Sequence, residues 1–234
     1  MSEVSENLKE VEKRIRAACE RSGRDRSEVS LIAVSKTKPI EMIREAMGEG
    51  ISVFGENKVQ ELVAKHDELE GNNLEWHMIG HLQRNKVNKL PGRVKMIHSV
   101  DSLRLAEEIE HQFGKADIVA DILVEVNMAG EESKFGLAPQ DVEPFLLKIA
   151  NFNHICPRGL MTIAPFVEDP EENRKIFTDL RKLLIDIQDK NYDNIDMTEL
   201  SMGMTGDYEV AIEEGATFVR VGTGIFGSRN YEKG

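Results

Sequence analysis

The chain has 234 residues, with 30 Lys and Arg against 42 Asp and Glu, and therefore a formal net charge of −12. This length is sufficient for a domain that buries its own core without disulfides or metals. The acidic total argues against a nucleic-acid partner, because such a protein would present a basic surface to phosphates. The only two cysteines, Cys19 and Cys156, form no CxxC pair. This argues against a disulfide framework or a cysteine zinc site and indicates a reducing compartment.

The sequence carries no sign of export or of a membrane partner. Residues 1–6 lack the basic and apolar regions of a signal peptide. The most apolar stretch, residues 116–126, is interrupted by three acidic residues and is too short to span a bilayer. We therefore expect a cytoplasmic protein.

In chain order, a helix comes first and strands then alternate with helices. Apolar residues at helical spacing, followed by Gly23, predict a helix over residues 3–22. Short β-rich runs then recur, with amphipathic helical patterns between most of them. The predicted strands lie near residues 30–35, 51–54, 74–79, 95–99, 120–127, 155–161, 197–201 and 217–222.

Eight alternating strand–helix units predict a parallel sheet covered by helices. In about 200 residues they fit a (β/α)₈ TIM barrel, here with an extra N-terminal helix and a single domain over residues 1–234. An open doubly wound sheet is the alternative, although it usually has fewer strands. In a barrel, functional side chains lie just past the carboxyl ends of the strands.

Lys36 is the most informative of the polar residues that follow the predicted strands. In strand alternation it shares a face with Ile32 and Val34, which suits the interior of a barrel. Burial would lower the pKa of its amine, and the nearby Lys38 would lower it further, which favours Schiff-base formation with a carbonyl compound. The alternative is a lysine at the rim whose amine reaches solvent.

The last predicted strand leads into a glycine-rich turn. Residues 222–227 fit GxGxxG, but too few residues follow for a dinucleotide-binding unit. A phosphate site is a better interpretation, because the loops after strands 7 and 8 often hold phosphate in barrels. The loop after strand 7 offers Ser201, Gly203 and Thr205. Arg220, on the face of Phe218 and Gly222, is expected to meet a ligand or a carboxylate.

Seven segments, in order along nearly the whole chain, resemble the pyridoxal phosphate homeostasis proteins, a family similar to the barrel domain of alanine racemases. The segments are AVSKTKP (33–39), FGENKVQE (54–61), WHMIGHLQ (76–83), ESKFG (132–136), GLMTIAP (159–165), LSMGM (200–204) and VRVGTGIFG (219–227). The resemblance implies a protein that binds pyridoxal 5′-phosphate (PLP) as a Schiff base on a lysine.

Carried over residue by residue, the resemblance makes Lys36 the Schiff-base lysine and places Arg220 at the pyridine nitrogen. The remaining predicted contacts are Asn57 in the pocket, Met161 against the ring, and Ser201, Gly203, Gly222 and Thr223 around the phosphate. A cation beside the ring nitrogen disfavours its protonation and so makes the ring a poorer electron sink.

The implied function is PLP homeostasis: the protein would hold PLP and release or deliver it, with PLP-dependent apo-enzymes as recipients and without robust catalysis of its own. A racemase needs a second acid/base, which in that group comes from a C-terminal β-domain that we expect this chain to lack. Two enzymatic alternatives stay open: a PLP-dependent amino-acid racemase or lyase, and a Schiff-base aldolase acting on a sugar phosphate.

Several further features carry less information. His77 and His81 have HxxxH spacing, but on a strand, so we expect hydrogen-bonded histidines rather than a metal site. The basic residues of 84–95, within the acid-free stretch 76–100, predict an exposed helix, and a patch that binds an anion or a partner is the alternative. Lys134 is expected to be a loop lysine, although it could react transiently with PLP. We expect a monomer.

Overall fold

The computed structural model describes residues 2–131, 134–193 and 195–228, so residues 132 and 133 of the ESKFG segment lie outside it. Eight parallel strands close into a barrel in the order β1 to β8, with β1 paired to β8. The strands are β1 Ser30–Val34, β2 Val53–Glu56, β3 Glu75–Met78, β4 Met96–Val100, β5 Ala120–Glu125, β6 Ile155–Met161, β7 Glu199–Met204 and β8 Phe218–Val221. The predicted (β/α)₈ barrel is confirmed.

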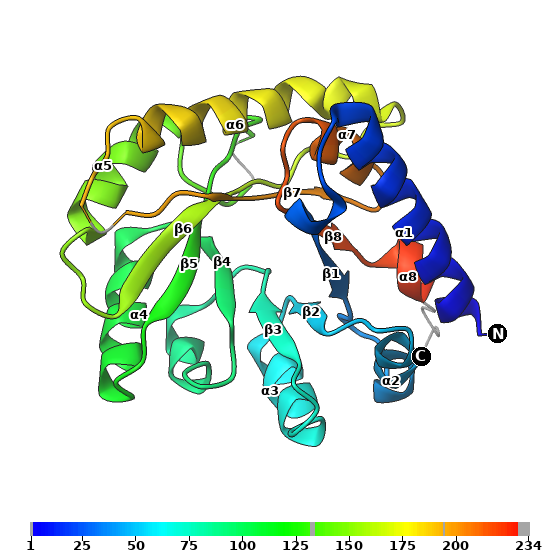
Figure 1. Cartoon of the computed structure of the whole chain (residues 1–234). Helices are drawn as coiled ribbons and strands as arrows, with labels where there is room; N and C mark the ends of the chain where they lie inside the picture. Colours follow the sequence, from blue (N-terminus) through cyan, green and yellow to red (C-terminus); the bar gives the residue numbers. More distant parts are fainter. Residues whose placement is uncertain (1, 132–133, 194, 229–234) are drawn as a thin grey trace.

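Helices surround the barrel (Figure 1). The α-helices are α1 Glu3–Ser22, α2 Ile40–Gly48, α3 Val59–Glu68, α4 Leu103–Lys115, α5 Pro139–Ile149, α6 Arg174–Gln188, α7 Tyr208–Glu213 and α8 Thr223–Phe226. Three short 3₁₀ helices complete the described elements: η1 Arg26–Glu28, η2 Arg84–Lys89 and η3 Pro170–Asn173. Among these described helices, none is both long and apolar enough to cross a membrane.

The extra N-terminal helix agrees with its prediction to the residue. The side chain of Ser2 accepts a hydrogen bond from the amide of Ser5, and Gly23 ends the helix with φ of 68°. One face of α1 buries apolar side chains such as Ile15. The helix packs against α7, α8 and α2, so it covers the seam where the two ends of the barrel meet (Figure 1).

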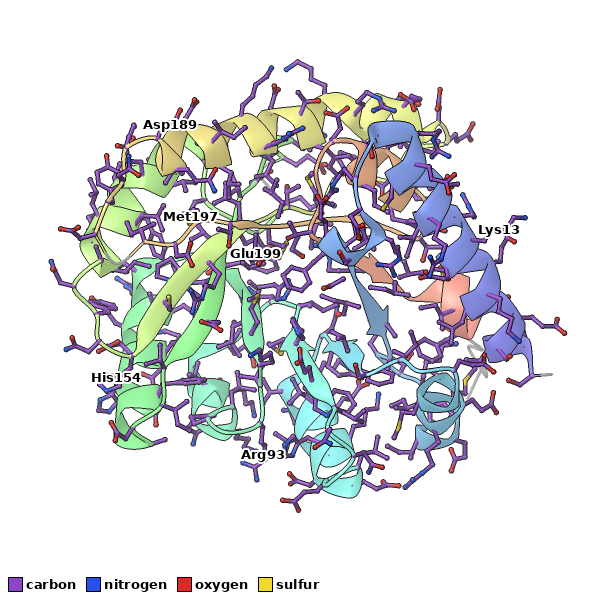
Figure 2. The ribbon with its side chains drawn as sticks, in the orientation of Figure 1. Lys13, Arg93, His154, Asp189, Met197 and Glu199 are labelled. Atoms are coloured by element: carbon purple, nitrogen blue, oxygen red, sulfur yellow. The ribbon has the colours of Figure 1, made fainter. Side chains whose placement is uncertain are left out.

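The connection between β3 and β4 differs from the prediction. It contains the 3₁₀ helix η2 instead of an α-helix, because Val87 is the only side chain of residues 84–89 that is buried. A single apolar anchor does not form the stripe that holds an amphipathic helix on a sheet. Farther along this connection Arg93 pairs with Asp67 of the α3 end at 3.0 Å, at the periphery of the molecule (Figure 2).

Side chains fill the barrel rather than leaving a pore (Figure 2). Ile32 and Val34 pack inward with Ile79, whereas Leu31 and Ala33 belong to the larger core between the strands and the helices. This alternation is the one predicted for β1. The apolar filling leaves the carboxyl ends of the strands as the place where polar side chains gather.

Candidate functional site

A cavity of about 440 Å³ lies at the carboxyl ends of the strands, within the size range of small-molecule sites. Five of the predicted site residues line it: Lys36, Asn57, Arg220, Gly222 and Thr223. Apolar side chains, including Ile79 and the almost fully exposed Phe166, complete the wall.

A larger hollow of about 760 Å³ lies outside the barrel, between α1 and the segment after α2. Its charged groups largely satisfy one another: Glu12 pairs with Arg16 and Arg26, and Glu49 with Lys9. No set of polar groups on its wall converges on one point as the strand-end groups do. We therefore take the strand-end cavity as the candidate site.

A strained turn holds Lys36 at the cavity. β1 ends at Val34, and the next residue after Lys36, Thr37, has φ of 62°. Positive φ is unfavourable for a β-branched residue and costs of order 1–3 kcal/mol, so the surroundings must enforce it. The carboxylate of Glu61 does so in part by accepting a hydrogen bond from the Thr37 amide at 2.7 Å.

A buried network behind this turn ties it to α3. The amine of Lys65 donates to Glu56 Oε1 at 2.6 Å and to the carbonyl oxygen of Ser35 at 2.8 Å. The hydroxyl of Ser35 also donates to Glu56, at 2.7 Å. Burial raises the pKa of Glu56 despite the pairing with Lys65. The residue immediately before Lys36 is thus fixed through both its carbonyl and its side chain.

Lys38, which follows Lys36 by two residues, is bound to the end of α8. Its amine donates to the carbonyl oxygens of Phe226, Gly227 and Ser228, at 2.8, 3.1 and 3.1 Å. This lysine therefore anchors the end of α8 and contributes no direct contact to the cavity wall.

Asn57 is placed by a close approach of two strand ends. A Cβ atom on Gly80 would lie 2.6 Å from the Asn57 Cα, so only glycine allows this contact. The side-chain oxygen of Asn57 is buried and has no hydrogen-bond partner among the described residues. An unsatisfied polar atom on a cavity wall indicates a ligand contact.

Arg220 is a buried cation beneath the cavity, 4% exposed. Its guanidinium donates to Ser201 Oγ and, at 2.8 Å, to the carbonyl oxygen of Thr162. Burial lowers the pKa of Arg220 to about 10, and the negative charges of Asp207 and Glu125 oppose this shift. Its direct hydrogen-bond partners are thus neutral, while the compensating carboxylates stand farther off.

Thr205 completes the glycine-rich corner. Its hydroxyl oxygen accepts hydrogen bonds from the amides of Gly222 and Gly224, each at 3.3 Å, and it lines the cavity. Two amides and a hydroxyl that converge in this way can hold a phosphate. Thr205 was recognised in the sequence as a hydroxyl of this loop, but it was not among the predicted contacts.

Three predicted contacts do not reach the cavity wall. The Ser201 hydroxyl is fully buried against Arg220 and His98. Met161 packs inside the barrel with Met96 and Leu123. Gly203 lies in β7 with φ of 88°, and a Cβ there would lie 2.9 Å from the Tyr208 backbone, so only glycine allows the strand to approach α7 this closely.

The other histidines and acids of this end form contacts that the sequence did not reveal. His81 stacks on Phe135, with ring centroids 3.8 Å apart, and lies 3.5 Å from Asp101. Burial, together with repulsion from Asp101, raises the pKa of Glu125 to about 7, while Arg220 lowers it. The described residues contain no group of three or more His, Cys, Asp or Glu arranged for a metal.

Comparison with known proteins agrees with this arrangement. A family model for the N-terminal domain of alanine racemase matches residues 7–230. The pyridoxal phosphate homeostasis protein of Aquifex aeolicus is 47% identical over 97% of this chain and 98% of its own length. The chain belongs to the family of pyridoxal phosphate homeostasis proteins. The Escherichia coli member is 38% identical over the whole of both chains.

A similar structure has been solved with PLP bound. PipY from Synechococcus elongatus with PLP bound has a TM-score of 0.82 and 36% identity, and the match covers 96% of this chain and all of that one. The predicted family is thus confirmed, while the individual contacts of Lys36, Asn57 and Arg220 with a ligand stay predictions.

Proposed function

We propose that this chain binds PLP in the strand-end cavity, with Lys36 as its covalent attachment point. The observation that carries the proposal is convergence: the amine of Lys36, the buried cation Arg220 and the glycine-rich corner of Thr205 and Gly222 line one cavity of about 440 Å³. When bound, PLP supplies an aldehyde that condenses with a primary amine, with loss of water, to form a Schiff base. The PLP complex of PipY supports this ligand for the family.

The residues of the cavity fit the three parts of PLP. Thr205, Gly222 and Gly224 would hold the phosphate, and Arg220 would lie at the ring nitrogen. Asn57, whose side-chain oxygen is buried and unsatisfied, would face the polar edge of the ring. The net charge of −12 does not prevent phosphate binding, because charges beyond about 10 Å are largely screened.

We further propose that the protein holds and releases PLP in the cytoplasm as a monomer, handing it to apo-enzymes, without robust catalysis of its own. The ionisable side chains among the described residues of the cavity wall are Lys36, Asp207 and Arg220. Asp207 is already occupied by hydrogen bonds from the Asn173 side chain and the Met204 amide. A two-base reaction needs a second group poised to exchange a proton with the ligand, and the described wall does not offer one.

The visible spectrum tests this proposal. The purified protein with added PLP should absorb at about 420 nm, as Schiff bases of PLP do, and borohydride should fix PLP on the peptide that contains Lys36. Lys36→Ala should abolish both signals. Lys38→Ala is the matched control, because its amine donates to backbone carbonyls at the end of α8, and it should retain both signals.

Two outcomes would contradict the proposal. A protein that stays colourless with PLP but is trapped by borohydride with a sugar phosphate would be an aldolase. Steady turnover of an amino acid, at about 1–10³ s⁻¹, would show a true PLP enzyme, whereas a stoichiometric loss of colour agrees with a carrier.

A further inference from the structure

A chain of polar side chains runs down through the apolar interior of the barrel from Arg220. The guanidinium donates to Ser201 Oγ, Ser201 Oγ lies 2.9 Å from His98 Nδ1, and His98 Nε2 lies 2.8 Å from His77 Nδ1. All four side chains are nearly or completely buried, and the ring of Phe218 packs against both imidazoles.

Counting donors and acceptors gives one arrangement of these hydrogen bonds in which the hydrogens of Ser201 and His98 both have acceptors. A guanidinium can only donate, so the Ser201 oxygen accepts from Arg220 and its own hydrogen is available to His98 Nδ1. If His98 Nδ1 donated to Ser201 instead, the Ser201 hydrogen would have no acceptor among its hydrogen-bonded partners in the described residues. His98 Nδ1 therefore carries no hydrogen, and the neutral imidazole of His98 carries its hydrogen on Nε2, where it donates to His77 Nδ1. Burial, with the positive charge of Arg220, lowers the pKa of His98 well below its ordinary value and so favours this neutral form.

The series of hydrogen bonds ends at His77. By the same count, His77 carries its hydrogen on Nε2, a buried atom without a hydrogen-bond partner among the described residues. The Glu75 carboxylate, at the other end of the barrel, lies 4.0 Å away. All the bonds therefore run in one sense, away from the arginine and toward the amino ends of the strands.

We propose that His98 is a positioning residue for the ligand site and that it acts through Ser201 and Arg220. By accepting the Ser201 hydrogen, His98 turns a Ser201 lone pair toward Arg220. The carbonyl of Thr162 holds the other terminal nitrogen of the guanidinium. Together these two acceptors fix the plane of the guanidinium and the N–H groups that it presents to the cavity. The inference rests on PLP binding as proposed above, with Arg220 at the ring nitrogen.

Two substitutions at residue 98 separate this role from simple packing. His98→Leu fills the space but offers Ser201 no acceptor, whereas His98→Asn places an amide oxygen near the position of Nδ1. With Leu, PLP should leave the protein about 5- to 100-fold faster, as expected for losing one oriented buried acceptor, and the pH at which its visible band changes should shift. With Asn, both quantities should return toward those of the wild type.

Ser201→Ala tests whether His98 acts through Ser201. It should reproduce the effect of His98→Leu, and the double variant should be no worse than either single one, because the residues act as a unit. Equal release rates and equal pH titrations of the band in the wild type, His98→Leu and Ser201→Ala would overturn the proposal, as would additive effects.

A measurement without PLP keeps the two proposals distinguishable. In the ligand-free wild type, ¹⁵N NMR of the imidazoles should show His98 neutral with its hydrogen on Nε2. A hydrogen on Nδ1 would overturn the positioning role even if PLP binds, and even if the residue-98 variants fail to fold. If the tautomer is as expected but PLP gives no visible band with the wild type, the proposed function is wrong. The positioning role, which rests on PLP binding, is then wrong as well.

Discussion

At the scale of single residues, the site is defined by charges that are buried without direct ionic partners. Arg220 donates to neutral oxygens, while the side chain of Glu125 is 5% exposed and forms no hydrogen bond within the described part of the chain. Glu125 and Asp207 compensate part of the charge of Arg220, and Arg220 in turn favours the ionised form of Glu125. A cavity floor of this kind is prepared to receive a charged ligand but costs stability.

Glu125 makes this cost measurable. Because its pKa rises from 4.5 to about 7 on folding, the folded chain binds this proton more tightly than the unfolded chain. The stability that the proton contributes is complete below pH 4.5 and is lost as the pH rises to about 7, by roughly 3 kcal/mol. Glu125→Gln cannot ionise. The free energy of unfolding of the variant should therefore rise relative to that of the wild type as the pH increases from 4.5 to about 7. Urea unfolding of the PLP-free proteins at about pH 5, 6 and 8 tests this, and parallel profiles would contradict it.

Thr205 offers a second prediction for a single residue. Thr205→Val keeps the shape but removes the oxygen toward which two amides point. We expect the affinity for PLP to fall about 5- to 100-fold, the cost of a lost hydrogen bond to a charged group or of an unsatisfied buried donor. Thr205→Ser retains the hydroxyl and should bind like the wild type. Equal dissociation constants for the Val and Ser variants, from titration of the visible band, would exclude a phosphate contact.

At the scale of elements, the periodicity of the sequence predicts the strands well and their ends poorly. β7 shows why this matters. The apolar pattern predicts an end near Ser201, but the strand continues to Met204, with an irregular register against β8 between Ser201 and Met204. Ser201 therefore lies inside the barrel, and Thr205 lies at the rim, where it lines the cavity. A single sequence does not reveal such an irregularity, because it depends on the pairing of two distant strands.

The hydrogen-bond network of Lys65, Glu56 and Ser35, which links β1, β2 and α3, could not be predicted from the sequence. Lys65 and Glu56 lie nine residues apart along the chain and meet only because α3 folds back over the strand ends. Lys65→Met would leave Glu56 buried without its cation, so we expect a loss of about 3–5 kcal/mol in the free energy of unfolding.

The double variant Lys65→Met with Glu56→Gln is the matched control for this loss. It removes the stranded charge and should recover much of the stability. Chemical denaturation measures both variants. If the single variant loses less than about 1 kcal/mol, the pair contributes no more than a surface ion pair, and the network does not hold the turn of Lys36.

At the scale of the whole molecule, the proposed ligand bridges the seam at which the barrel closes. Lys36 follows β1, while Arg220 and Gly222 belong to β8 and its end, and these two strands join the beginning of the chain to its end. The helix α1 covers the same seam from outside, where Arg14 and Arg21 pair with Glu209 of α7. Since closure of the barrel involves all eight strands, binding across this seam should stabilise the domain as one unit.

PLP should therefore raise the midpoint of a single thermal transition. At a free concentration of about 100 times the dissociation constant, binding adds about 2.7 kcal/mol, or roughly 5–10 °C for a domain of this length. Inorganic phosphate at the same concentration, which can occupy only the Thr205 corner, should give a much smaller shift, and so should PLP with Lys36→Ala. Scanning calorimetry distinguishes the outcomes: one transition that moves with PLP agrees with a ligand that clamps the seam. Two transitions, of which PLP moves only one, would show that closure of the barrel and occupancy of the cavity are independent.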